Sequence, residues 1–297
     1  MSPLLPASRV RLVGAYWWRV GRATVKAIDE DRCLDLAAQL SFYLVLAMFP
    51  ALLVIVSLLG YLPVENAAAG LLMLVGRVAP SAMVELLAVQ AREIMADGRA
   101  DLATVGMAGA LWSSSAAMRA VIEALNRIYR VAEWRPWWRR RLVALGLTLA
   151  FGLFTTASLL LVLAGPEALA SVAAIVGART TVSFAWQLLR WPAMVALVVL
   201  GIGIVYHVAP NRPVRWAWTT PGALLATALW IGSSFLFKLY VTHLGTFSVT
   251  YGAIGGVIVV LLWLYLSSLA ILVGAELNSA IALQAREQAA GSGADAR

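Results

Sequence analysis

The chain has 297 residues, of which 62% are hydrophobic and 13% are charged, and its net charge is +8. A soluble globular protein has about 25% charged residues, so this composition excludes an ordinary soluble fold and indicates a helical membrane protein. We expect the positive charge to mark cytoplasmic loops rather than a nucleic-acid site. The single cysteine, Cys33, excludes an internal disulfide and a multi-cysteine metal site.

Residues 1–35 are predicted to form a cytoplasmic amphipathic helix. Within residues 11–30, Leu12, Tyr16 and Val20 fall on one helical face, beside a stripe of basic side chains. A basic helix of this kind with neighbouring tryptophans suits a membrane surface. It suits packing against the cytosolic end of a helical bundle equally well, and the sequence leaves both interpretations open.

Residues 36–280 are predicted to form a six-span membrane domain. The clearest span is 252–275, whose 24 uncharged residues would make a helix roughly 36 Å long, enough to cross a bilayer core of about 30 Å. Residues 63–101 should add amphipathic helices near the outer side, and 281–297 should form a disordered cytoplasmic tail. The fold class is therefore an all-α, polytopic integral membrane protein. The expected spans are 36–62, 102–118, 142–165, 186–206, 219–237 and 252–275.

The distribution of basic residues predicts the orientation. Of the 23 Lys and Arg residues, 17 lie in four segments: the N-terminal segment, the loop between spans two and three, the loop between spans four and five, and the tail. Positively charged residues stay on the cytoplasmic side, so both termini should be cytoplasmic. An even number of spans requires the same.

A serine cluster and a charged helical face close the second span. Arg119, Glu123 and Arg127 follow at successive i+4 positions, which predicts pairing along one helix face. Arg119 itself has two interpretations. It is either a positive anchor at the inner membrane boundary or a ligand for a phosphate or carboxylate head group.

Seven short motifs carry a resemblance to a known family. They are Leu36–Tyr43 followed by Phe49-Pro50, Leu111-Trp112-Ser113, Ala124–Tyr129, Pro210-Asn211-Arg212, Pro221-Gly222-Ala223, Tyr251-Gly252-Ala253 and Gly274–Asn278. In this order and spacing, over about residues 25–280, the chain resembles the YihY/BrkB family of bacterial inner-membrane proteins.

The resemblance implies a six-span protein of the bacterial cytoplasmic membrane. The family has carried a ribonuclease label and a virulence label, and some members have been linked to lipid or envelope transport. The motif positions that we expect to have structural roles are Trp112, Asn126, Arg127, Pro210, Asn211, Pro221, Gly222, Gly252, Glu276 and Asn278.

The ribonuclease label finds no support in the residues. Metal-dependent hydrolysis needs clustered His, Asp or Glu ligands around a water. His207 and His243 should lie at opposite ends of the bundle, and the acidic residues within 29–35 have the character of a solvated helix end. We therefore expect no metal, no cofactor and no enzyme activity.

Two functions remain open. The first is a transporter or flippase for an amphipathic anionic envelope molecule, such as a lipid. The second is a non-transporting scaffold or regulator of envelope assembly. A cavity open to one side would favour the first and a solid core the second. Expected partners are membrane lipids, with a homo-oligomer or an envelope protein also considered. Candidates for the substrate path are Gln39, Ser41, Tyr43, Pro50, Ser113, Ser115, Arg119, Lys238, Tyr240 and Tyr251.

Overall fold

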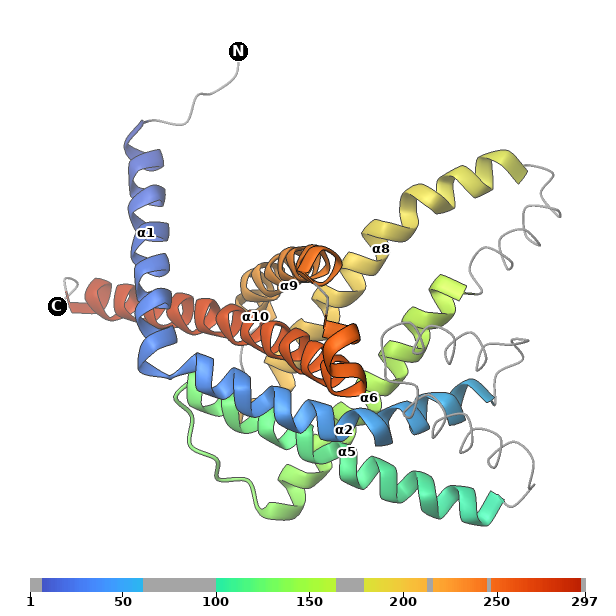
Figure 1. The fold of residues 1–297 in the computed structure, drawn as a ribbon. Helices are drawn as coiled ribbons and strands as arrows, with labels where there is room; N and C mark the ends of the chain where they lie inside the picture. Colours follow the sequence, from blue (N-terminus) through green and yellow to red (C-terminus); the bar gives the residue numbers. More distant parts are fainter. Residues whose placement is uncertain (1–6, 61–99, 164–178, 213–215, 245–246, 295–297) are drawn as a thin grey trace.

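The computed structural model describes residues 7–60, 100–163, 179–212, 216–244 and 247–294, and these parts are helical apart from short connections. The expected all-α class is therefore confirmed. Figure 1 shows seven long helices in the described residues. They are α1 (Ala7–Glu30), α2 (Cys33–Gly60), α5 (Ala100–Ile128), α6 (Trp137–Leu163), α8 (Arg179–Val208), α9 (Trp216–Leu244) and α10 (Phe247–Ala294).

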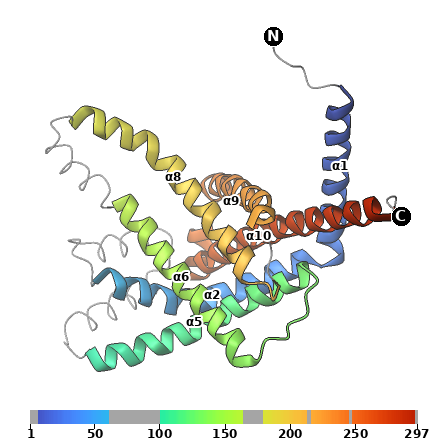
Figure 2. The ribbon, with the colours of Figure 1, turned by 180° about the vertical axis from the view of Figure 1, so that it is seen from behind.

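Helix α10 is the axis around which the others are arranged. It packs against α9 on one side and against α2 and α5 on another, and α1 crosses its C-terminal half (Figures 1 and 2). Helices α2, α5, α6 and α8 converge toward one end and diverge toward the other. We call the convergent region the packed end. There the start of α2, the end of α5, the end of α8, the start of α9 and residues 272–278 of α10 meet.

The hydrophobic core lies at the packed end. Small side chains such as Ala37, Ala223 and Ala275 are fully buried beside large ones such as Ile122 and Tyr206, so the helices approach closely. Further along α6, α8 and α9, large apolar side chains are exposed. This is the arrangement expected of surfaces that face lipid rather than water. Examples are Phe151, Leu153, Leu188, Leu189, Phe235 and Leu236.

Helices α9 and α10 are also joined by two tryptophan–serine contacts in their apolar parts. The indole N–H of Trp230 donates to Ser267 at 3.1 Å, and that of Trp263 donates to Ser234 at 3.2 Å. The donors come from opposite helices, so each helix satisfies a polar group of the other. A hydroxyl or indole N–H in an apolar environment needs such a partner.

Four of the helices are long and apolar enough to cross a membrane within the described residues. They correspond to the expected third, fourth, fifth and sixth spans. The expected first and second spans fall on α2 and α5, whose apolar halves include side chains outside the described set, so the count of six stays a prediction. The four segments are Trp137–Ser158, Leu188–Val208, Thr219–Tyr240 and Val257–Arg286, with Cys33–Met48 as a shorter apolar helix.

The structure differs from the sequence predictions at both ends of the chain. The N-terminal helix ends at Glu30, and Arg32 takes a positive φ of 53° before α2 begins at Cys33. At the C-terminus, residues 281–294 are helical instead of disordered. They are rich in alanine, glutamine and other strong helix formers, and Ile281 packs against Val20 of α1. The amphipathic helices expected in 63–101 lie almost wholly outside the described residues.

Candidate functional site

A polar network closes the loop between α5 and α6. Asn126 donates to Glu133 at 2.8 Å, and its side-chain oxygen accepts the backbone N–H of Asn211 at the same distance. Arg135 donates from Nε and Nη2 to the two oxygens of Glu133, both at 2.8 Å, and also to the carbonyl of Ala209. The motif residues Asn126 and Asn211 therefore tie the end of α5 to the end of α8.

The electrostatics of this loop follow from the same contacts. The hydrogen bonds from Arg135 lower the pKa of the Glu133 carboxyl below its ordinary value, against the opposing effect of burial. Both side chains are largely buried, and their pairing is therefore much less screened than a surface ion pair. The chemistry is that of a structural clamp, with no free acid or base.

A second polar contact joins α9 to α10. The side-chain oxygen of Asn278 accepts the backbone N–H of Gly222 at 2.7 Å, and its amide donates to the carbonyl of Thr219 at 3.1 Å. Pro221 precedes Gly222 and has no N–H of its own to donate. The motif residues Gly222 and Asn278 thus form a specific bond between two helices.

Glu276 lies at the packed end with almost no exposed surface. Its Oε1 accepts a hydrogen bond from the thiol of Cys33 at 3.4 Å, which joins α10 to the start of α2. Arg127 of α5 approaches Asp31, just before α2, with an Nε–Oδ1 distance of 3.8 Å. These contacts hold the start of α2 against α10 and the segment before α2 against α5.

The pairing expected along α5 is replaced by pairing between elements. Glu123 contacts Arg140 of α6 at 3.6 Å, and Arg127 contacts Asp31 rather than Glu123. The reason is the crossing of α5 by its neighbours, which places charges of other segments closer than the next turn of α5. Arg119 is left without a carboxylate partner among the described residues.

Arg119 shares its face of α5 with Trp112, and a second arginine that the sequence did not single out packs on Trp112. Arg141 of α6 is 92% buried, donates from Nη2 to the carbonyl of Trp112 at 2.7 Å, and stacks 3.5 Å above the centre of the Trp112 ring. The Nε atoms of both arginines are buried and have no hydrogen-bond partner in the part of the chain that the structure describes. We call Trp112, Ser115, Arg119 and Arg141 the arginine pair site.

Helix geometry explains why these residues meet. Trp112, Ser115 and Arg119 stand at i, i+3 and i+7 on α5, so they share one face. Ser115 is fully buried and donates to the carbonyl of Trp112 at 2.7 Å. Arg141 comes from the first two turns of α6, which crosses that face. The site offers two neighbouring guanidinium groups and no matching negative charge among the described residues.

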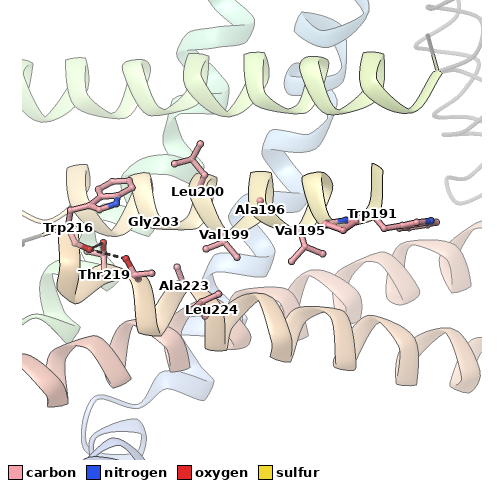
Figure 3. A pocket seen from close by; sticks show the side chains of 12 residues that line it. Trp191, Val195, Ala196, Val199, Leu200, Gly203, Trp216, Thr219, Ala223 and Leu224 are labelled. Atoms are coloured by element: carbon pink, nitrogen blue, oxygen red, sulfur yellow. Dashed lines mark hydrogen bonds between the residues drawn. The ribbon is translucent and has the colours of Figure 1, made fainter. Parts of the chain in front are cut away.

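A groove runs between α8 and α9. It encloses about 720 Å³, is partly open, and has almost wholly apolar walls. Figure 3 shows Trp191 and Trp216 at opposite ends, with Val199 and Ala223 between them on facing helices. From residue 191 to residue 203 the α8 wall is about 18 Å long. The remaining lining residues are Pro192, Val195, Ala196, Leu200, Gly203, Thr219, Thr220 and Leu224.

The substrate-path candidates whose side chains the structure describes lie in separate places. Ser41 is buried and bonds to the carbonyl of Ala38, while Gln39 is exposed and Tyr43 packs against the core of the packed end. Lys238 and Tyr240 are exposed near the other end of α9. Ser115 and Arg119 come together in the arginine pair site. The structure does not describe the side chains of three candidates, Pro50, Ser113 and Tyr251. Of the motif residue Gly252 it describes only the position within α10.

No cluster of three or more His, Cys, Asp or Glu side chains that could hold a metal is found in the described ranges. The long apolar helices, the lipid-like exposure of their side chains and the polar contacts that tie the packed end define a polytopic helical membrane protein. The chain belongs to the family whose model is described as Virulence factor BrkB, which matches residues 24–297. The expected YihY/BrkB membership is confirmed.

The relatives carry two kinds of name. The chain is 32% identical over 243 residues to the ribonuclease-like protein YfkH of Bacillus subtilis (strain 168), covering 82% of this chain and 88% of YfkH. It is 29% identical over 269 residues to a UPF0761 membrane protein of Xanthomonas oryzae pv. oryzae (strain PXO99A), covering 88% of this chain and 60% of that relative. No solved structure matches the chain. The family is a membrane-protein family and not a known enzyme family, although YfkH is named ribonuclease-like.

Proposed function

We propose that this membrane protein binds and moves an amphipathic anionic molecule, such as a lipid, of the bacterial envelope. The single observation that carries the proposal is the groove between α8 and α9. Its volume is in the range of small-molecule sites, and apolar walls of this length suit an acyl chain. A packed bundle without such a groove would have favoured a scaffold.

The ends of the groove suit the two regions of a lipid. At the packed end, Trp216 and the hydroxyls of Thr219 and Thr220 provide polar atoms beside the apolar wall. At the other end, Trp191 is 62% exposed, as expected of an amphipathic ring at a membrane surface. Between them the walls are aliphatic. The packed end is proposed to lie on the cytoplasmic side of the inner membrane, because the basic first turns of α6, with Arg139 and Arg140, belong to it.

A photoreactive lipid tests this proposal. The purified protein is placed in bilayers that contain a phospholipid with a photoactivatable group in its acyl chain, and crosslinked peptides are mapped. We expect crosslinks on α8 and α9 between residues 191 and 224. Ala196→Trp fills the groove and should lower this crosslinking severalfold.

Leu189→Trp is the matched control. Leu189 lies on the same helix and is 63% exposed, but it does not line the groove. Crosslinking of that variant should equal the wild-type value. Equal crosslinking in the wild-type protein and Ala196→Trp, with both folded, would contradict the proposal.

A further inference from the structure

We propose that the arginine pair site binds a phosphate monoester, a head group that carries close to two negative charges. The inference rests on the proposed function, since it names the head-group chemistry of the amphiphile. It starts from an imbalance. Arg119 lies on the face of α5 that Arg141 meets at Trp112, Arg141 is 92% buried, and neither forms an ion pair with a carboxylate of the described residues.

A buried cation such as Arg141 is unfavourable unless an anion compensates it, and the partly buried Arg119 adds a second positive charge to the same face of α5. The nearest acidic side chain on the same helix, Glu123, is engaged with Arg140 at 3.6 Å. The buried Nε atoms of both arginines have no acceptor among the residues that the structure describes. A bound anion would supply acceptors and negative charge at once, because guanidinium groups form paired hydrogen bonds with phosphate oxygens.

The number of charges selects the ligand class. A phosphate diester or a carboxylate carries one negative charge and leaves one guanidinium uncompensated. A phosphate monoester carries about −1.5 to −2 at pH 7, because its second pKa is about 6. Arg141 is held by the carbonyl and the ring of Trp112, so its guanidinium is already oriented before the anion binds. Ser115 adds a buried hydroxyl on the same face of α5.

The experiment uses the full chain in phosphatidylcholine nanodiscs that contain equal amounts of phosphatidic acid, a monoester, and phosphatidylglycerol, a diester. Lipid retained by the purified protein is quantified by mass spectrometry. The wild-type protein should retain phosphatidic acid over phosphatidylglycerol by about tenfold at pH 7. Below about pH 5 the preference should disappear, because the monoester then carries one charge. No preference at either pH would overturn the proposal.

Variants locate the preference. Arg119→Gln and Arg141→Gln should each abolish it, and Arg141→Lys, which keeps the charge and loses the paired geometry, should weaken it severalfold. Arg139→Gln is the matched control, since Arg139 belongs to the same basic run and is exposed. A loss in Arg139→Gln as large as in Arg119→Gln would overturn the site. The Arg119 side chain donates no hydrogen bond to another described residue, so its variant is expected to stay folded even if Arg141→Gln is not.

Two further arms separate the sources and the two proposals. Calorimetric titration with inorganic phosphate shows whether the free anion binds. If inorganic phosphate binds the wild-type protein and Arg119→Gln removes that binding, the site is supported with free phosphate as a ligand. If phosphate does not bind but the preference for the monoester lipid is retained, the site is supported with lipid as the source. Crosslinking that Ala196→Trp lowers, without any monoester preference, would overturn this inference and leave the proposed function standing.

Discussion

The side chain of Asn278 binds the backbone of Gly222, whose N–H donates to Asn278 Oδ1 at 2.7 Å. The side-chain amide of Asn278 also donates to the carbonyl of Thr219. One side chain of α10 therefore satisfies two backbone groups of α9. Gly274 lies opposite. A Cβ on Gly222 would overlap the Gly274 carbonyl, and a Cβ on Gly274 would overlap the Gly222 carbonyl, so neither glycine leaves room for a side chain. The contact of α9 with α10 at the packed end therefore depends on backbone-to-backbone approach.

Gly222→Ala should strongly destabilise the protein. The added methyl group would overlap Gly274 and the Asn278 amide, so the helices must separate and the hydrogen bond must lengthen. The free energy of unfolding should fall by roughly 3 kcal/mol or more, because overpacking and the loss of a buried hydrogen bond act together. Thermal unfolding in detergent measures it. Gly232→Ala on the same helix is the control, because nothing lies within 4 Å of the added atom. Equal unfolding temperatures for the two variants would contradict the close contact.

The Glu133–Arg135 clamp predicts an acid-sensitive loop. The pKa of Glu133 is lowered from 4.5, first by the hydrogen bonds of Arg135, so its stabilisation is complete above that value and is lost as pH falls through the lower folded pKa. Glu133→Gln should cost roughly 1–3 kcal/mol at pH 7. Below about pH 4.5 the stability of the Glu133→Gln variant should depend less on pH than the stability of the wild-type protein. Glu123→Gln, a change in a more exposed pair, should alter little at either pH. Parallel pH curves for wild-type and Glu133→Gln would refute the clamp.

The thiol of Cys33 predicts a difference between two substitutions of similar size. Cys33→Ser keeps a donor for Glu276, whereas Cys33→Val leaves a carboxyl that is 1% exposed without that hydrogen bond. The valine variant should unfold with a free energy lower by roughly 1–3 kcal/mol than the serine variant. Urea or thermal unfolding in detergent gives the comparison. A valine variant as stable as the serine variant would show that Glu276 does not need the thiol.

Much of the fold follows from local sequence. The uncharged stretches of the sequence predict the positions of α6, α8, α9 and α10, because a long apolar run in a membrane forms a helix regardless of the segments beside it. Ion pairs between side chains of different helices were harder to predict from the sequence. The spacing of Arg119, Glu123 and Arg127 predicts pairing within α5, but Glu123 reaches Arg140 because α6 crosses there. Crossing geometry has no local signal.

The candidate site shows the same division. Ser115 and Arg119 stood out as polar residues at the end of an apolar run, and they lie in the arginine pair site. Arg141 did not stand out, since the run 139–141 reads as a uniform basic segment. Successive residues on a helix point about 100° apart, so Arg141 is buried against Trp112 of α5 and Arg140 reaches Glu123, while Arg139 stays exposed. The groove was not predicted, because walls of apolar side chains look the same in sequence whether they face lipid or a cavity.

The orientation remains a prediction, which thiol labelling in intact cells can test. In a Cys33→Ser background, which keeps the donor to Glu276, single cysteines are introduced as Asp97→Cys and Arg139→Cys. An impermeant thiol reagent should label the first from outside and the second only after the membrane is opened. Arg139 is exposed, so failure to label it reflects location and not burial. The reverse pattern would place the packed end outside.

Transbilayer movement of a lipid tests the central claim most directly. The purified protein is reconstituted into vesicles that contain a fluorescent anionic phospholipid, and a membrane-impermeant quencher reports the fraction exposed outside over time. The wild-type protein and Leu189→Trp should move the lipid faster than protein-free vesicles, and Ala196→Trp should be slowed toward the protein-free rate. If folded wild-type protein and protein-free vesicles give the same rate, the protein does not move lipids by itself and the transport account is wrong.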